Sequence, residues 1–268
     1  MGEAMRTSIN KRFPWLKFAI PIVFGAFLGL VVAGVMHGVR GETRNIPKAP
    51  MRIHSEVPNR VFRGDLTGKK LVALTFDDGP ADGVTTRLLD VLKEKGAVAT
   101  FFELGMRMRA YPHITQRAIK EGHEVGSHTM YHQNLITLPE DAIRGDITEA
   151  KDVFREVLGE GPELTRVPYG NSNDAVKNVA GTPLVYWSVD TKDWESKNAG
   201  AVVENTLSNT RDGSIVLMHD IYDSTVDAVP EIIDRLRADN FEFVTVSELA
   251  EIRGVELVSG ETYSKFEP

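Results

Sequence analysis

The sequence predicts an α/β fold of parallel strands joined by crossover helices, preceded by one membrane-spanning helix. Two patterns support this prediction. From residue 69 onward, short apolar runs alternate with amphipathic stretches, which is the order of strands and crossover helices in parallel sheets. Before them, residues 18–36 carry no ionisable side chain. Periodicity alone leaves open whether the strands close into a barrel or form an open, doubly wound sheet.

Composition excludes several classes of protein. The chain has 268 residues and no cysteine, so it is long enough to bury a core without disulfides, and cysteine chemistry and lipoprotein anchoring are excluded. Its 38 Asp and Glu outnumber 31 Lys and Arg, which gives a net charge of -7 and argues against a nucleic-acid partner. No pattern indicates a protein partner.

The N-terminal region predicts membrane attachment. Residues 1–17 are basic and are expected to be cytoplasmic, and residues 18–36 are expected to be an uncleaved transmembrane signal-anchor that leaves the rest of the chain outside the cell. A cleaved signal peptide, which would make the protein secreted, is the alternative, although its apolar region is usually only about 7 to 15 residues long. A buried core helix is a weaker alternative.

The exported part divides into three segments. Residues 37–65 mix Pro, Gly and charges without apolar periodicity, which predicts an extracellular linker. One folded domain is expected over residues 66–254, and residues 255–268 form a C-terminal tail without a recognisable motif. Seven strands are predicted in the domain, at residues 71–76, 98–102, 123–127, 164–167, 184–189, 215–218 and 241–246.

Three stretches between the strands have helical periodicity. Leu88, Val91 and Leu92 share one face of a helix that Gly96 ends. A second helix begins with a capping box over Thr137–Glu140. The apolar faces of the second and third helices consist of Ile143, Ile147, Ala150 and Phe154, and of Val229, Ile232, Ile233 and Leu236.

Polar motifs follow five of the predicted strands, and the carboxyl ends of parallel strands meet on one face of the fold. Taken singly, each motif has an ordinary structural explanation, such as a turn, a solvated histidine pair, an ion pair or a core aromatic residue. Their occurrence together at one face makes those explanations improbable. The motifs are Thr75–Pro80 (TFDDGP), Ser127–His132 (SHTMYH), Arg166–Gly170 (RVPYG), Asp190–Trp194 (DTKDW) and Leu217–Asp220 (LMHD).

The residue types in these motifs indicate metal-assisted hydrolysis. One carboxylate with His128 and His132 makes a three-ligand set that leaves a coordination position open. A metal in such a site lowers the pKa of bound water from ~15.7 towards 7. A second carboxylate remains as a base and His219 as an acid, and the residues alone do not distinguish Asp77 from Asp78 in these roles. A non-haem iron oxygenase or an inactive wall-binding module fits this complete set of base, ligands and acid less well.

Together and in this order, the five motifs resemble those of the polysaccharide deacetylase family (carbohydrate esterase family 4, the NodB-homology domain), over residues 69–252. The resemblance implies a distorted (β/α) barrel and metal-dependent removal of acetyl groups from glycans. It implies Asp77 as the catalytic base. Asp78, His128 and His132 would bind one divalent ion, Zn²⁺ or alternatively Co²⁺.

The same resemblance implies roles for the remaining motif residues. Arg166 would pair with Asp77 and favour its ionised form, because a nearby cation stabilises a carboxylate. Asp193 would favour the imidazolium form of His219, which would be the acid. Tyr169 would offer its backbone N–H to the developing oxyanion, and two side chains would line the acetyl pocket. These two residues are Trp194 and Leu217.

The predicted location narrows the predicted substrate. A domain tethered outside the cell meets peptidoglycan, so N-acetylglucosamine of peptidoglycan is the expected target. Acetylated xylan and chitin or chitooligosaccharides are the alternatives, because the same site chemistry serves them.

Overall fold

The computed structural model describes residues 66–268, so the predicted basic segment, transmembrane helix and linker at residues 1–65 lie outside the described residues. Within residues 66–268, no helix has the length and apolar character needed to cross a membrane.

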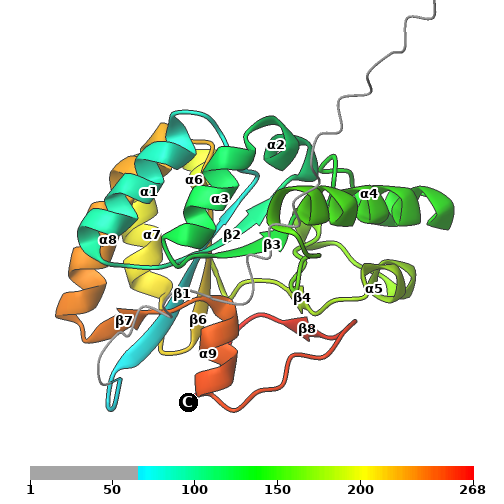
Figure 1. Ribbon diagram of the computed structural model, residues 1–268. Helices are drawn as coiled ribbons and strands as arrows, with labels where there is room; N and C mark the ends of the chain where they lie inside the picture. The colour runs from blue at the N-terminus through cyan, green and yellow to red at the C-terminus, as the bar shows by residue number, and fades with distance from the viewer. Residues whose placement is uncertain (1–65) are drawn as a thin grey trace, which may run out of the picture. The chain divides into compact units, whose positions relative to one another are not determined.

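A parallel sheet forms the centre of the fold, with β1 in the middle (Figure 1). The order is β3-β2-β1-β6-β5, and β6 covers one edge of β1 from Val72 to Asp77. The other edge of β1 pairs with β7 near its start and with β2 near its carboxyl end. The strands are β1 (Lys70–Asp77), β2 (Thr100–Glu103), β3 (Glu124–Ser127), β5 (Val189–Asp190), β6 (Ser214–His219) and β7 (Phe241–Phe243).

Three predicted strands are markedly shorter than expected: the strand at 241–246 ends at Phe243 as β7, and the other two are those at 164–167 and 184–189. Residues 164–167 contribute only Thr165, which bridges Ser127 on one side and Leu184 on the other. Pro162 and Pro168 flank this stretch, and proline cannot donate to a ladder. The predicted strand at 184–189 is two strands, β4 (Leu184–Val185) and β5, because the chain bends between them from one partner strand to another.

The structure therefore confirms a parallel α/β fold, but it does not establish the expected closed barrel. Single bridges at Thr165 connect β3 to β4, and β4 pairs in parallel with β8 (Thr262–Tyr263). A further single bridge joins Ser214 to Lys265. Among residues 66–268, these bridges do not amount to a continuous ring of ladders.

Helices cover the outside of the sheet (Figure 1). Neighbouring helices pack in the order α7, α8, α1, α3, α4 and α5. The predicted apolar faces of α1, α4 and α8 are buried or partly buried as expected, and Gly96 ends α1 with a φ of 57°. The helices are α1 (Val84–Lys95), α2 (Gly105–Ala110), α3 (Pro112–Lys120), α4 (Glu140–Leu158), α5 (Asp174–Ala180), α6 (Asp193–Ser196), α7 (Ala199–Asn209), α8 (Asp223–Ala238) and α9 (Val246–Ile252).

The capping box predicted for α4 is wrong. Pro139 occupies the N-cap position and makes no side-chain cap, while the Thr137 hydroxyl donates to Asn134 O over 2.7 Å. Thr137 instead ends the short 3₁₀ turn Leu135–Thr137. A capping box does occur at α9, between Thr245 and Glu248.

The last residues of the chain are part of the folded structure. Residues 255–268 carry no motif in the sequence, yet they contain β8 and the buried side chain of Phe266. The Phe266 N–H donates to Gly213 O over 2.9 Å. This segment therefore packs against the start of β6.

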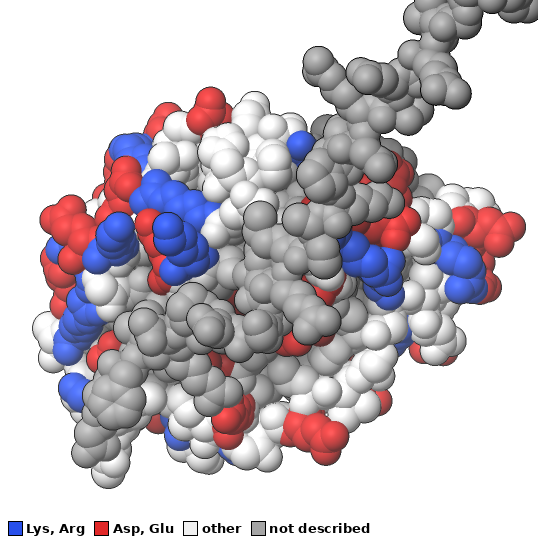
Figure 2. Space-filling model, in the orientation of Figure 1, with Lys and Arg blue, Asp and Glu red and all other residues white. Residues whose placement is uncertain are grey.

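Charged side chains of both signs are interspersed over α1 and α8 (Figure 2). Arg87 of α1 pairs with Asp223 and Asp227 of α8, and Lys95 pairs with Asp234. The pairs are largely exposed and contribute little to stability.

Candidate functional site

Strand register brings the polar motifs to one edge of the sheet. Asp77, the last residue of β1, lies opposite His219 of β6 and Phe102 of β2. Ser127 of β3 lies opposite Glu103 of β2. The loops that follow β1, β3 and β6 therefore begin side by side.

Three of the predicted residues form a cluster that fits a metal ion. Asp78 Oδ1 lies 3.5 Å from His128 Nε2 and 3.4 Å from His132 Nε2, and one ligand atom from each residue lies within 4.8 Å of the others. Asp78 Oδ1 is buried and has no hydrogen-bond partner among residues 66–268. One carboxylate with two imidazoles is a common donor set for a hydrolytic metal site.

The environment of His128 favours the neutral, metal-binding form of its ring. Its Nδ1 lies 2.6 Å from Arg166 O, so the carbonyl fixes the proton on Nδ1 and leaves the Nε2 lone pair facing Asp78. Burial lowers the pKa of His128 to about 3, although the Asp78 charge opposes this shift. His128 is therefore neutral at physiological pH.

The backbone of the cluster is held in an uncommon conformation. Asp78, Thr129 and His132 have φ angles of 76°, 71° and 56°. The left-handed region costs a non-glycine residue roughly 1–3 kcal/mol, and such residues gather at functional sites. Neighbouring groups must therefore stabilise both loops.

Arg166 fixes Asp77 from inside the fold. Its side chain is fully buried and donates from Nη1 to Asp77 Oδ1 and to Thr75 Oγ1, each over 2.7 Å. It also donates to the carbonyls of Val185 and Tyr186, at the bend between β4 and β5. These bonds leave Asp77 Oδ2 on the side of His128, 3.8 Å from Nε2.

The charge of Arg166 does not determine the direction in which the pKa of Asp77 is shifted. Burial raises the pKa of Asp77, and the Arg166 guanidinium only partly opposes that rise. The net direction is thus opposite to the one expected from Arg166 alone, because desolvation disfavours the carboxylate more strongly.

Asp193 holds His219 through two hydrogen bonds. Asp193 Oδ1 lies 2.9 Å from His219 Nδ1, and Oδ2 accepts from the His219 backbone N–H over 2.7 Å. Burial by itself would lower the pKa of His219, but the Asp193 hydrogen bond and the charges of Asp193, Asp77 and Asp78 raise it to about 9. The ring is therefore protonated near neutral pH.

The three residues predicted on the substrate side lie in different settings. The Tyr169 ring makes an edge contact with the His132 ring, with 4.8 Å between the ring centroids. Tyr169 is 61% exposed, and its own backbone φ is 62°. Trp194 is exposed at the start of α6, whereas Leu217 is buried in β6 opposite Thr75. Tyr169 thus lies beside the cluster of Asp78, His128 and His132, whereas Leu217 is buried within the sheet.

Four buried residues around the site were not given roles in the sequence analysis. Thr75 accepts from Arg166, and Thr225 donates to Asp193 Oδ2 over 2.8 Å. Asp146 of α4 accepts from the Met130 N–H between the two histidines, and Asp220 packs against Gly79 in the loop after β1. Thr75 and Asp220 stand inside the motifs, whereas nothing in the sequence marks Thr225 or Asp146.

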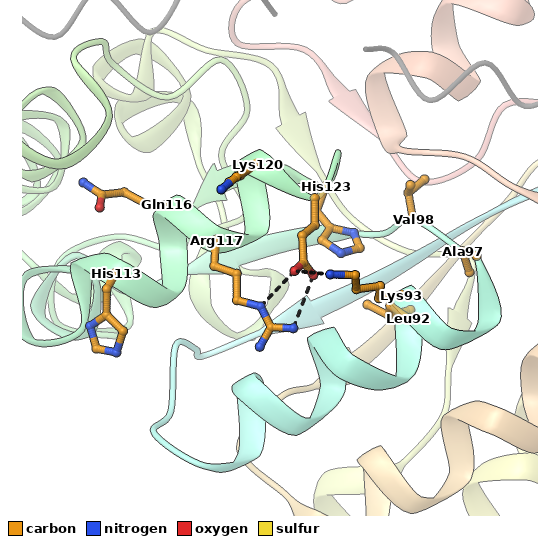
Figure 3. A pocket seen from close by; sticks show the side chains of 11 residues that line it. Leu92, Lys93, Ala97, Val98, His113, Gln116, Arg117, Lys120 and His123 are labelled. Carbon is orange, nitrogen blue, oxygen red and sulfur yellow. Dashed lines mark hydrogen bonds and ion pairs between the residues drawn. The ribbon is translucent and has the colours of Figure 1, made fainter. Parts of the chain in front are cut away.

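A separate pocket of about 700 Å³ lies at the amino ends of β2 and β3, away from this site (Figure 3). Three of its charged groups pair with one another: Arg117 and Lys93 both contact the Glu121 carboxylate. None of the motif residues lines it.

The chain is similar to known polysaccharide deacetylases. A family model described as polysaccharide deacetylase matches residues 64–182. The peptidoglycan-N-acetylmuramic acid deacetylase PdaC of Bacillus subtilis is 38% identical over 185 residues, which cover 69% of this chain and 40% of PdaC. This chain thus spans about two-fifths of PdaC.

A shorter relative is covered almost completely. A peptidoglycan-N-acetylglucosamine deacetylase of Bacillus cereus is 37% identical over 202 residues, which cover 72% of this chain and 91% of the relative. Among solved structures, a family 4 acetyl xylan esterase from Clostridium thermocellum, in complex with a cobalt ion, aligns with a TM-score of 0.71 and 31% identity, covering 74% of this chain and 100% of the esterase chain.

Proposed function

Because this chain belongs to the polysaccharide deacetylase family, we propose that it is a metal-dependent hydrolase that removes N-acetyl groups from peptidoglycan, with N-acetylglucosamine as the target. The observation that carries the proposal is the cluster of Asp78, His128 and His132, with a second carboxylate at Asp77 and a protonated imidazole at His219 beside it. These groups match the needs of amide hydrolysis.

In this proposal, one divalent ion, zinc or cobalt, is held by Asp78, His128 and His132. When bound, the ion would polarise the acetyl carbonyl and make a water molecule more acidic. Support comes from the unpartnered Asp78 Oδ1 and from the tautomer of His128 that Arg166 O selects. The cobalt complex of the acetyl xylan esterase relative is in line with this choice of ion.

Asp77 would be the base. Arg166 occupies its Oδ1, so Oδ2 is the atom that accepts a proton from the attacking water. Burial, which raises the pKa of Asp77, strengthens it as a proton acceptor.

His219 would be the acid. Asp193 binds Nδ1, which leaves Nε2–H to give its proton to the departing nitrogen as the amide C–N bond breaks. The products are the free amine of the sugar and acetate. The Tyr169 backbone N–H would stabilise the carbonyl oxygen as it gains negative charge.

We further propose that residues 18–36 anchor the chain in the cell membrane, with the catalytic domain over residues 66–254 facing the wall. The basic flank at residues 1–17 and the uncharged 19-residue run support this orientation.

We also propose that the sheet is the distorted barrel expected of the family, and the bridges at Thr165 and Lys265 are in line with it.

The test measures acetate released from purified peptidoglycan and from acetylated xylan. We expect the wild type to release acetate from peptidoglycan, and Asp77→Asn to lose ~10²-fold or more of the rate while it still binds zinc. Mass spectrometry of the product sugars shows whether glucosamine or muramic acid carries the new amine. Release only from xylan would overturn the substrate, and a fully active Asp77→Asn would overturn the base.

A further inference from the structure

The loop after β1 carries the candidate ligand Asp78 in a left-handed conformation, with a φ of 76°. Such a conformation persists only where the surroundings hold it. Several hydrogen bonds involve this loop. One of them runs from the Leu104 N–H to Gly79 O over 3.0 Å.

The buried carboxylate of Asp220 packs against Gly79 in this loop. Asp220 is only 1% exposed, and its Oδ2 accepts from the Thr85 hydroxyl over 2.6 Å. The same hydroxyl oxygen accepts from the Ala81 N–H over 2.7 Å. Thr85 therefore links the carboxylate to the end of the loop.

The contact with Gly79 is close. A Cβ placed on Gly79 would lie 2.1 Å from Asp220 Oδ2 and 2.5 Å from Cγ, far below any van der Waals distance. The Asp220 N–H also donates to Asp77 O over 3.3 Å. Asp220 thus touches the loop directly on both sides of Asp78, at Asp77 and at Gly79.

Stability alone does not explain a carboxylate at this position. Asp220 Oδ1 has no hydrogen-bond partner among the described residues, and an unsatisfied buried oxygen costs free energy. The carboxylate nevertheless packs on the loop that presents Asp78 Oδ1 to the two histidines.

We propose that Asp220 is a positioning residue for Asp78: its carboxylate, linked through Thr85 to Ala81 and packed on Gly79, holds the loop so that Asp78 Oδ1 faces His128 and His132. This inference rests on the metal site of the proposed function. Asp220 is not one of the three grouped candidate ligands. It acts through the backbone of the loop, as the outer partners of metal ligands do.

The experiment measures zinc affinity, by competition with a chromophoric chelator, and the visible spectrum of the cobalt form. In Asp220→Ala we expect zinc affinity to fall about 10- to 100-fold and the cobalt spectrum to change. Thr85→Val, which removes the link to Ala81 but keeps the shape, should shift affinity in the same direction by a smaller factor. Asp223→Ala removes an exposed carboxylate of α8 and is the matched control, with unchanged affinity.

A double substitution tests the contact itself. Gly79→Ala should weaken zinc binding because its methyl group meets the Asp220 carboxylate, and adding Asp220→Ala should make room for that methyl group. The double variant should therefore lose less affinity than the two single losses combined. Circular dichroism of each variant confirms that it is folded.

The outcomes separate this inference from the proposed function. A wild type that binds no zinc would overturn the metal site and with it the proposed function. A wild type that binds zinc, with Asp220→Ala binding it equally well, would overturn the role of Asp220 and leave the proposed function standing.

Discussion

Asp193 shows how one buried carboxylate sets the state of a neighbouring residue. It is fully buried and accepts hydrogen bonds from the His219 backbone, from Thr225 and from the Trp194 N–H, in addition to its contact with the His219 ring. These donors hold the carboxylate in place, and among residues 66–268 no Arg or Lys forms an ion pair with it. Its negative charge is thus available to stabilise the His219 imidazolium.

The pH dependence of activity should reveal this pairing. His219 must be protonated to act as an acid, and its pKa of about 9 predicts that kcat/KM falls as pH rises through about 9. Asp193→Asn removes the charge that raises the pKa, so the alkaline fall should move to lower pH by a unit or more.

Steady-state rates measured from pH 6 to 10 check this prediction. Thr225→Val, which leaves the Asp193 carboxylate intact, is the control and should shift the alkaline fall much less. An Asp193→Asn variant with an unchanged alkaline fall would show that another group causes the loss of kcat/KM at high pH.

At the scale of elements, β2 carries a buried acid that should make stability depend on pH. Burial raises the pKa of Glu103 to about 8 from its ordinary 4.5, and the Thr115 hydroxyl is its hydrogen-bond partner. The folded state keeps the proton while the unfolded chain releases it above pH 4.5. The stability due to this proton is therefore full below pH 4.5 and is lost as pH rises to about 8.

Glu103→Gln should remove this dependence. As pH rises from 4.5 to 8, the wild type should lose unfolding free energy on the order of a few kcal/mol that the variant keeps, since one pKa unit corresponds to ~1.4 kcal/mol. Urea unfolding of both proteins at pH 5 and pH 8 measures the difference. An equal difference at the two pH values would contradict the raised pKa.

The C-terminal segment should contribute to stability. Phe266 is 3% exposed and stacks on Tyr263 of β8, with ring centroids 5.7 Å apart. Phe266→Ala should cost about 3 kcal/mol of unfolding free energy, the lower end for a buried phenylalanine. Val258→Ala in the same segment, at a side chain that is 48% exposed, is the control and should change the urea midpoint little.

For the whole molecule, the proposed metal should couple binding to folding. An ion that binds only the folded state at 100 times its Kd adds ~2.7 kcal/mol, which corresponds to roughly 5–10 °C in Tm for a domain of this size. A chelator should therefore lower the Tm of the zinc-loaded wild type by this amount. In His132→Gln the chelator should have little effect, and a similar drop in both proteins would place the bound ion elsewhere.

The α/β class and the grouping of Asp78, His128 and His132 were predictable from local sequence patterns. Apolar periodicity identified the buried faces of α1, α4 and α8, because burial requires one apolar face wherever the helix packs. The motifs identified the groups that gather around Asp78, because chemistry depends on residue type and parallel strands bring their carboxyl ends together. Both kinds of information are local in the chain.

Features that depend on residues far apart in the chain became apparent only in the folded structure. The chain bends between β4 and β5, where Arg166 donates to two backbone carbonyls, and β4 pairs with the C-terminal segment. Neither the Arg166 contact nor the pairing of β4 can be read from a local sequence pattern. The net pKa shift of Asp77 and the contact of Asp220 with Gly79 likewise depend on burial and on packing across the fold. Desolvation and steric contact arise between residues far apart in sequence, so they are set only when the chain has folded.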